Sequence, residues 1–315
     1  MKTQTATRCL VVTALLVLMA LGGGLAYAVQ KVVGDEPPHA HAAVYPLLED
    51  LTSDDPSLRT GAAMALRELG PAAWLAVPAL IEALSDPLVS VRKGAAGALG
   101  GIGPAAASAV PALTGTLVDP HRFVRSWAAM ALYEIGPAAE SATAELIQMM
   151  ESDSENLRGR SWCATALPKI GADADLAVPA LTRALVDDAS EEVRSVAVLS
   201  LEKYGLEAAQ RGAMLSLVDA LSDRHWKVRG NAACALPEMG DDTGLAISRL
   251  SGALRDDAAY VRGCAAQSLG EIGPAAREVA HELEPLLEDE DDHVRSQAQQ
   301  ALTRLRASDD PPDDS

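Results

Sequence analysis

Aromatic side chains are rare in this chain. They make up 3% of its 315 residues and include a single phenylalanine, so alanine and leucine carry most of the apolar pattern. Small side chains let helices approach one another closely, but they leave little room for a deep pocket of the kind that holds a small substrate. The composition therefore argues against a buried catalytic cavity.

Positive charge is also scarce. The chain has 26 lysines and arginines against 44 aspartates and glutamates, which gives a formal net charge of −18. Nucleic acid and anionic lipid head groups are bound by clustered lysine and arginine side chains. We therefore expect no nucleic-acid partner, and membrane contact only through the N-terminal segment.

Sequence motifs that mark catalytic or cofactor sites are missing as well. The chain has no GxSxG, HExxH or phosphate-loop sequence and no glycosylation sequon. His39 and His41 have ligand-like spacing but no third ligand nearby, and His121 and His225 hold equivalent positions too far apart to share a metal. We expect no catalytic residue, no metal and no cofactor.

The N-terminal residues form the one long apolar run. Residues 1–28 combine a positively charged start, an apolar centre from Leu10 to Leu21 and a small-x-small site at 26–28, which is typical of a cleaved signal peptide. Residues 9–29 are also long enough to span a bilayer as an uncleaved anchor. Both alternatives export the rest of the chain to the periplasm or cell envelope, or beyond it, because the positive end stays in the cytoplasm.

The remainder of the chain is organised by a repeat. Residues 77–109 read as two short amphipathic helices, separated by a break at Pro87 and stopped by Gly103-Pro104. One such hairpin cannot bury both apolar stripes alone, and the chain supplies eight, mostly 33 residues apart. The repeats begin at Val44, Val77, Val110, Thr143, Val178, Met214, Ile247 and Ala280. We predict an all-α fold, a right-handed α-solenoid over residues 44–307, between a linker (29–43) and an acidic disordered tail (308–315).

The repeated unit D-P-x-x-x-V-R-x-x-A-A-x-A-L-x-x-I-G-P resembles HEAT-like repeats, specifically the subtype named after phycobilisome lyases. In that family an aspartate after the first helix and an arginine early in the second form a structural ladder, in which each arginine binds turn carbonyls or an aspartate of a neighbouring hairpin. Eight similar pairs indicate a structural role, since a catalytic residue would occur once. The resemblance implies ladder roles for Asp86, Arg92, Asp119, Arg125, Arg160, Asp187, Arg194, Asp223, Arg229, Asp256, Arg262, Asp289 and Arg295.

The same resemblance includes two enzyme classes. Chromophore lyases act in the cytoplasm or plastid, which the export signal disfavours here. Deoxyhypusine hydroxylase holds two irons with several His-Glu pairs, whereas this chain has one, His281-Glu282. We therefore predict that the protein is not an enzyme, and keep a lyase or accessory enzyme of these types as the alternative.

The cysteines leave two interpretations open. Cys9 lies in the export segment, and an odd number of mature thiols does not indicate a disulfide framework. Cys234 and Cys264 lie on the same helix face in adjacent repeats, so a bridge between them is conceivable. We favour the simpler interpretation, that Cys163, Cys234 and Cys264 are small residues at packed positions.

The candidate contact site lies on the second helices, which line the concave side in the family. Tryptophan follows the arginine by two positions in two consecutive repeats, and other apolar residues lie beside it at exposed positions. Such an apolar patch rimmed by charge is typical of a binding surface, although Trp127 could equally pack on the notch left by Gly94 and Gly97. The candidate partner-binding residues are Trp127, Met130, Trp162, Val196 and Leu199.

The sequence thus predicts a non-enzymatic, exported or membrane-anchored interaction scaffold that binds an unidentified protein or peptide on its concave face. A structural component of the cell envelope is the third possibility.

Overall fold

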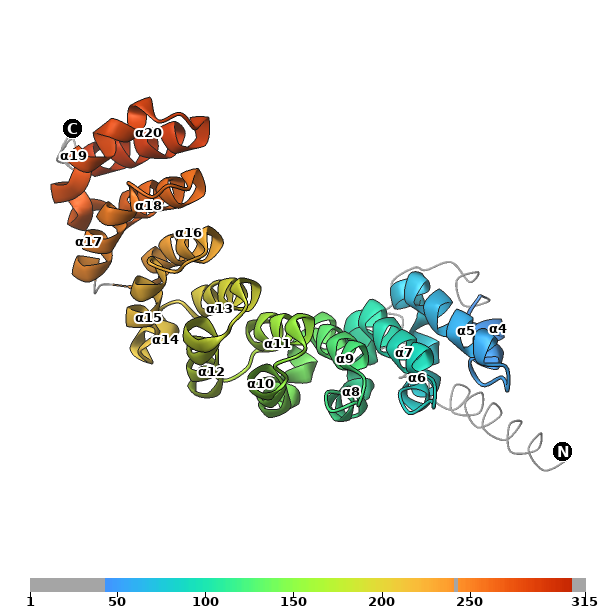
Figure 1. The fold of residues 1–315 in the computed structure, drawn as a ribbon. Helices are drawn as coiled ribbons and strands as arrows, with labels where there is room; N and C mark the ends of the chain where they lie inside the picture. The colour runs from blue at the N-terminus through green and yellow to red at the C-terminus, as the bar shows by residue number, and fades with distance from the viewer. Residues whose placement is uncertain (1–42, 241–242, 308–315) are drawn as a thin grey trace, which may run out of the picture. The chain divides into compact units, whose positions relative to one another are not determined.

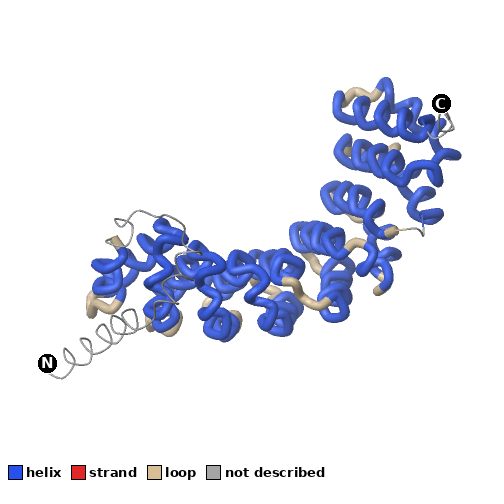
Figure 2. Tube along the Cα trace, turned by 180° about the vertical axis from the view of Figure 1, so that it is seen from behind, coloured by secondary structure: helices blue, strands red, loops and turns tan. Residues whose placement is uncertain are grey.

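The computed structural model describes residues 43–240 and 243–307, and within them it contains helices and loops but no strand (Figures 1 and 2). From Leu47 onward, the described residues form one compact unit. The predicted signal peptide or anchor, nearly all of the predicted linker and the predicted acidic tail lie outside the described residues.

Each repeat is a helical hairpin, as the sequence predicts. The first helices are α4 (Val44–Leu51), α6 (Val77–Ala83), α8 (Val110–Thr116), α10 (Thr143–Ser152), α12 (Ala174–Asp187), α15 (Ala213–Ala220), α17 (Thr243–Ala253) and α19 (Ala280–Leu283) with η6 (Glu284–Glu288). The second helices are α5 (Pro56–Leu69), α7 (Val89–Ile102), α9 (Arg122–Ile135), α11 (Leu157–Ile170), α13 (Glu191–Tyr204), α16 (Trp226–Ala235) with η4 (Leu236–Met239), α18 (Ala259–Ile272) and α20 (Asp292–Ala307). The all-α solenoid is therefore confirmed.

Short 3₁₀ helices connect most repeats. They are η1 (Gly70–Ala76), η2 (Gly103–Ala109), η3 (Gly136–Ala142) and η5 (Gly273–Val279). Each begins with a glycine at positive φ, such as +70° at Gly103, and the proline that follows cannot extend the preceding helix.

The first helices of repeats five and seven begin earlier than predicted. The helix α12 starts at Ala174 rather than Val178, and α17 starts at Thr243 rather than Ile247. No Gly-Pro connector precedes either helix, so the residues that elsewhere form the connector extend the helix. In repeat five the side chain of Asp173 caps the new start by accepting from the amide of Asp175 at 2.8 Å. A further short helix, α14 (Leu206–Gln210), occupies the insertion before repeat six.

Consecutive second helices pack directly against one another, as α7, α9 and α11 show in Figure 1. Small residues make this approach possible. A β-carbon added to Gly100 would lie 3.1 Å from the Cα of Ala131, and one added to Gly94 would lie 2.8 Å from the Cβ of Ala63. A larger side chain at either position would therefore force the neighbouring helices apart.

The residue before each ladder arginine shows how the stack builds its core. In six repeats it is a valine with 0% exposed surface: Val91, Val124, Val193, Val228, Val261 and Val294. The equivalent residue in the first hairpin, Leu58, is 45% exposed. No described hairpin precedes α5, so the face of α5 that carries Leu58 lacks the cover that a neighbouring hairpin gives to the others.

Two runs, Pro56–Ala83 and Val89–Thr116, are long and apolar enough to cross a membrane by length and composition. Each run joins the second helix of one repeat to the first helix of the next through a 3₁₀ connector. In the second run 61% of the most apolar window is buried in the stack, whereas in the first the buried share is 28% and Leu58 and Met64 are exposed.

Candidate partner-binding face

The ladder joins each hairpin to the next. Arg92 Nε lies 2.7 Å from Oδ2 of Asp119, its Nη2 donates to Oδ1 at 3.1 Å, and its Nη1 donates to the carbonyl of Asp86 at 3.0 Å. The Asp119 side chain also accepts from the amide of His121 at 2.8 Å. The other rungs, with Nε–Oδ2 distances of 2.6 to 2.8 Å, join Arg59 to Asp86, Arg125 to Asp153, Arg160 to Asp188, Arg194 to Asp223, Arg229 to Asp256 and Arg262 to Asp289.

One predicted ladder residue is wrong. Asp187 is the last residue of α12, and it is the carboxylate of the following residue, Asp188, that accepts from Nε and Nη2 of Arg160. Asp188 has an extended backbone, with ψ at 132°, which carries its carboxylate out of the helix toward Arg160. Because α12 ends one residue later than predicted, the second of two consecutive aspartates takes the ladder position.

The rungs are largely shielded from solvent, and this sets their electrostatics. Burial by itself would raise the pKa of Asp119, but the hydrogen bonds from Arg92 and from the His121 amide outweigh it and hold that pKa below its ordinary value. The same balance lowers the pKa of Asp223, whereas for Asp289 the bond from Arg262 is the leading cause. These carboxylates are therefore charged at neutral pH.

The ladder differs at its two ends, where the described residues contain no further hairpin. At the position equivalent to Asp86 the first repeat has Ser53, whose hydroxyl accepts from the amide of Asp55 and so keeps the turn without a buried charge. At the other end Arg295 keeps its bonds to the carbonyls of Asp289 and Glu290. No described hairpin follows, and its side chain pairs with Asp292 in its own helix.

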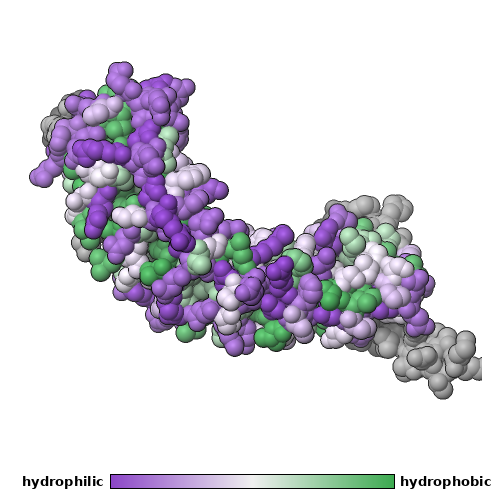
Figure 3. Space-filling model, viewed as in Figure 1, coloured by the Kyte–Doolittle hydropathy of each residue, from purple (hydrophilic) through white to green (hydrophobic). Residues whose placement is uncertain are grey.

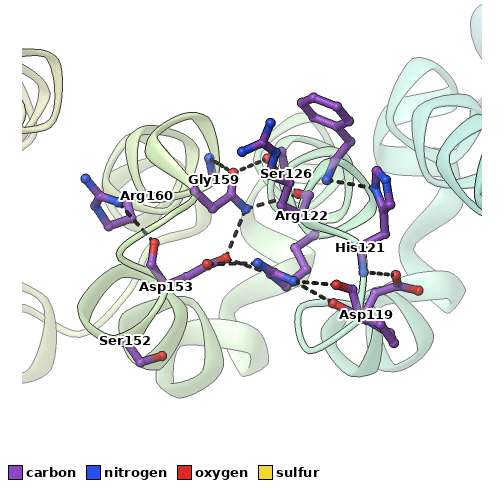
Figure 4. A network of polar contacts seen from close by, with 12 residues as sticks. Asp119, His121, Arg122, Ser126, Ser152, Asp153, Gly159 and Arg160 are labelled. Atoms are coloured by element: carbon purple, nitrogen blue, oxygen red, sulfur yellow. Dashed lines mark hydrogen bonds and ion pairs between the residues drawn. The ribbon is translucent and has the colours of Figure 1, made fainter.

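A buried asparagine ties the third hairpin to the fourth (Figure 4). Asn156 is 3% exposed, and its Nδ2 donates to the carbonyl of Arg122 and to Oδ2 of Asp153, both at 3.0 Å. Its Oδ1 accepts from the hydroxyl of Ser126 at 2.9 Å and from the amide of Gly159 at 3.0 Å. Every polar atom of this side chain has a partner, so the network fixes the start of α11 against α9.

A groove of about 910 Å³ crosses the second helices at this point. Its apolar lining comes from three consecutive hairpins, with Phe123 and Tyr133 on α9, Leu157 and Trp162 on α11, and Val196 on α13. Phe123 and Leu157 are 45% and 39% exposed. Hydrophilic side chains dominate the visible molecular surface, with smaller apolar areas between them (Figure 3).

The groove also carries charge of both signs. Arg122 and Arg158 lie in the first turns of α9 and α11, and Glu155 and Glu192 line the same end. Glu192 accepts a hydrogen bond from the hydroxyl of Ser161 at 3.3 Å. Glu134 lies at the opposite end of α9, so the two ends of the groove differ in charge.

Only some of the predicted contact residues line the groove. Trp162 and Val196 line the groove, and the ring of Trp162 lies 5.6 Å from that of Tyr133. Met130 is half-buried and Leu199 is 43% exposed, and neither lines the groove.

Trp127 packs back on the second hairpin instead. A β-carbon on Gly97 would lie 3.0 Å from its ring, and the guanidinium of Arg67 lies over that ring at 5.3 Å from its centroid. The predicted notch is therefore present at Gly97, but Gly94 does not contribute to it, because Gly94 faces Ala63. Trp127 joins three second helices rather than forming a patch with Trp162.

The sequence interpretation missed Phe123, Tyr133, Arg122 and Arg158. Phe123 and Arg158 hold the same repeat position, two residues before the ladder arginine. That position varies along the chain and also holds Lys, Tyr and His, so the sequence gives no signal that singles them out. The histidines have a role that was also missed. Nδ1 of His121 accepts from the amide of Phe123 at 3.3 Å and caps α9, and His225 caps α16 in the same way.

The cysteines differ from the favoured interpretation. Cys234 and Cys264 form a disulfide between α16 and α18, with their Cα atoms 5.2 Å apart, which lies in the usual range for such a bond. Packing as separate small residues is therefore wrong for this pair. Cys163 does fit that interpretation, since it is fully buried and burial raises the pKa of its thiol.

The described residues contain no other binding site as well formed as the groove. They contain no group of three His, Cys, Asp or Glu side chains that could hold a metal ion. Two smaller hollows, of about 520 and 260 Å³, lie beside the ladder and are lined by rung residues such as Arg160 and Arg125. The groove over α9, α11 and α13 is therefore the stronger candidate for a binding site.

Comparisons with known proteins agree with the geometry. An engineered protein of known structure is similar over 86% of this chain and 81% of its own, with 24% identity and a TM-score of 0.59. YibA of Escherichia coli is similar over 83% of this chain and 91% of its own, with 20% identity and a TM-score of 0.58. At these identities the likeness concerns the fold alone.

A third structure, the CpcE–CpcF complex of phycocyanin lyase from Nostoc, is similar over 86% of this chain and 97% of its own, with 23% identity and a TM-score of 0.46. No curated protein matches the chain. The sequence model for HEAT repeats matches residues 42–133, 77–167 and 214–303, which together span more than half of the chain. With its stacked hairpins and Arg–Asp ladder, the chain belongs to the HEAT-repeat family.

Proposed function

We propose that this protein is a non-enzymatic interaction scaffold that holds an extended segment of a partner protein in the groove over α9, α11 and α13. The observation that carries the proposal is the groove itself, about 910 Å³ in volume and lined by apolar side chains from three hairpins. Aromatic residues in such a surface are the usual anchors of protein recognition, because they bury a large area with few rotatable bonds.

A catalytic role finds little support among the described residues. Most carboxyl groups with lowered pKa values are rung aspartates, whose partners and repetition explain the shifts. The two others also have ordinary causes, since the pKa of Asp55 is lowered by hydrogen bonds from Ser57 and that of Glu282 by hydrogen bonds from Ser251 and Arg255. The groove brings together arginines and glutamates but no cysteine, no histidine and no metal-ligand cluster. A lyase or accessory enzyme remains the competing hypothesis, and its test is activity that depends on a groove residue.

We further propose that the repeats are exported, or anchored outside the cytoplasm by the N-terminal segment. The Cys234–Cys264 disulfide supports this, because such bonds persist in oxidising compartments and are rare in the cytosol. Thiol labelling of the protein from intact cells tests it. Export predicts that Cys234 and Cys264 resist alkylation until a reductant is added, and free thiols at both positions would contradict export.

The scaffold proposal is tested by selecting short random peptides on the full-length protein and titrating those enriched by fluorescence anisotropy. Trp162→Ala should weaken their binding by roughly tenfold or more, as loss of a tryptophan anchor does. Met64→Ala is the matched control, since Met64 lies on α5, 53% exposed and outside the groove, and its loss should change affinity little. Failure to enrich any peptide, or equal affinity for the two variants, would contradict the proposal.

A further inference from the structure

Most arginines in the described part of the chain are already bound to a carboxylate. Seven form inter-hairpin rungs, and others pair with surface acids, as Arg183 does with Glu151 and Arg211 with Asp175. This is expected, since acidic residues outnumber basic ones 44 to 26. An exposed arginine that makes no ion pair with a described carboxylate is therefore the exception.

Two of these exceptions lie together in the groove. Arg122 and Arg158 both line it, and neither forms an ion pair with any described residue, although Glu155 and Glu192 line the same end. Their backbones are fixed by the Asn156 network, which binds the carbonyl of Arg122 and the amide of Gly159, next to Arg158. The two side chains thus start from a rigid platform on adjacent hairpins.

The Arg122 side chain is also oriented. Its guanidinium lies over the ring of Phe123, 5.1 Å from the ring centroid. An arginine stacked in this way keeps the in-plane N–H groups at its edge available, and these are the donors that match the two oxygens of a carboxylate. Both arginines also lie in the first turn of a helix, where the backbone dipole favours a bound negative charge.

We propose that the groove recognises an acidic side chain, aspartate or glutamate, next to an apolar side chain in an extended peptide segment. The carboxylate binds Arg122 and Arg158, and the apolar side chain lies among Phe123, Leu157 and Trp162. This inference rests on the proposed function and names the chemistry of its partner. It makes a protein of net charge −18 a receptor for acidic segments, which bulk charge alone would repel.

The test uses an array of synthetic peptides in three matched sets, probed with the full-length protein. Each peptide has a phenylalanine or leucine beside a variable position that is acidic, the corresponding amide, or lysine. The acidic set should bind roughly 5- to 20-fold more tightly than the amide set, as expected for two partly exposed charged pairs, and this preference should fall as salt is raised. The lysine set should bind most weakly.

Arg122→Gln/Arg158→Gln should abolish the preference for acidic over amide peptides. The matched control is Arg249→Gln, because Arg249 is an exposed arginine on α17, outside the groove. Equal binding of acidic and amide peptides that still depends on Trp162 would overturn this inference and leave the proposed function standing. Absence of binding in all three sets would contradict both. Thermal melting of each variant excludes misfolding as the cause.

Discussion

Removing one carboxylate of the ladder should destabilise the protein far more than removing a surface carboxylate. Asp119→Ala deletes both carboxylate oxygens to which Arg92 donates and the acceptor for the amide of His121. The Arg92 and Asp119 side chains are only 14% and 8% exposed, so the variant leaves a poorly solvated charge without its counter-ion. Loss of one partner of such a pair costs about 3–5 kcal/mol, and the remaining bonds from Arg92 to backbone carbonyls place this rung near the lower limit.

The assay is urea unfolding followed by circular dichroism, where the stability change appears as a lower midpoint at unchanged slope. Glu68→Ala is the control, because Glu68 also pairs with an arginine, Arg67 at 2.7 Å, but is 72% exposed and should contribute about 0–1 kcal/mol. A midpoint for Asp119→Ala no lower than that for Glu68→Ala would refute the view that the rungs hold the hairpins together.

Three further predictions follow from the packing and the charges. Because the folded-state pKa values of Asp223 and Asp289 are lowered, their stabilising contribution is full above the unfolded value of about 4 and is lost as the pH falls through the folded values. Urea midpoints should therefore drop on acidification below about pH 4, and Asp223→Asn should flatten that dependence. Val124→Ala removes a fully buried side chain and should cost about 2–3 kcal/mol, whereas Leu58→Ala at the exposed equivalent position should cost about 1 kcal/mol or less by the same measurement. Trp127→Ala should lower the melting temperature through lost contact with Gly97 and Arg67, yet leave peptide affinity unchanged.

The repeat, and with it the fold, can be predicted from the sequence. Each hairpin has apolar stripes that it cannot bury alone, and the regular spacing places another hairpin of the same kind beside it. The ladder is implied by the resemblance to HEAT-like repeats, but its register at repeat five is not, because two consecutive aspartates follow the first helix there. Helix α12 ends one residue later than the pattern suggests, and this gives Asp188 rather than Asp187 to Arg160.

Contacts between neighbouring hairpins depend on how their second helices are aligned with each other, and this alignment cannot be seen in the sequence of a single repeat. The fifth residue after the ladder arginine faces the second residue after the next one, which brings Gly97 under Trp127 and joins Cys234 to Cys264. With that alignment the disulfide and the backward packing of Trp127 would have been predictable. The groove is harder to predict from the sequence, because its lining combines residues from the first turn of α9, the end of α9 and the middle of α11.

The most direct test of the central claim is site-specific photocrosslinking of the full-length protein in intact cells. A photoreactive phenylalanine analogue is placed at Thr165, which lines the groove, or at Val118, which is 75% exposed and outside it. We predict that one partner protein is crosslinked from Thr165, that the product is absent from Val118, and that Trp162→Ala removes it. Crosslinking of the same partner from Val118 but not from Thr165 would contradict the assignment of the groove as the binding site.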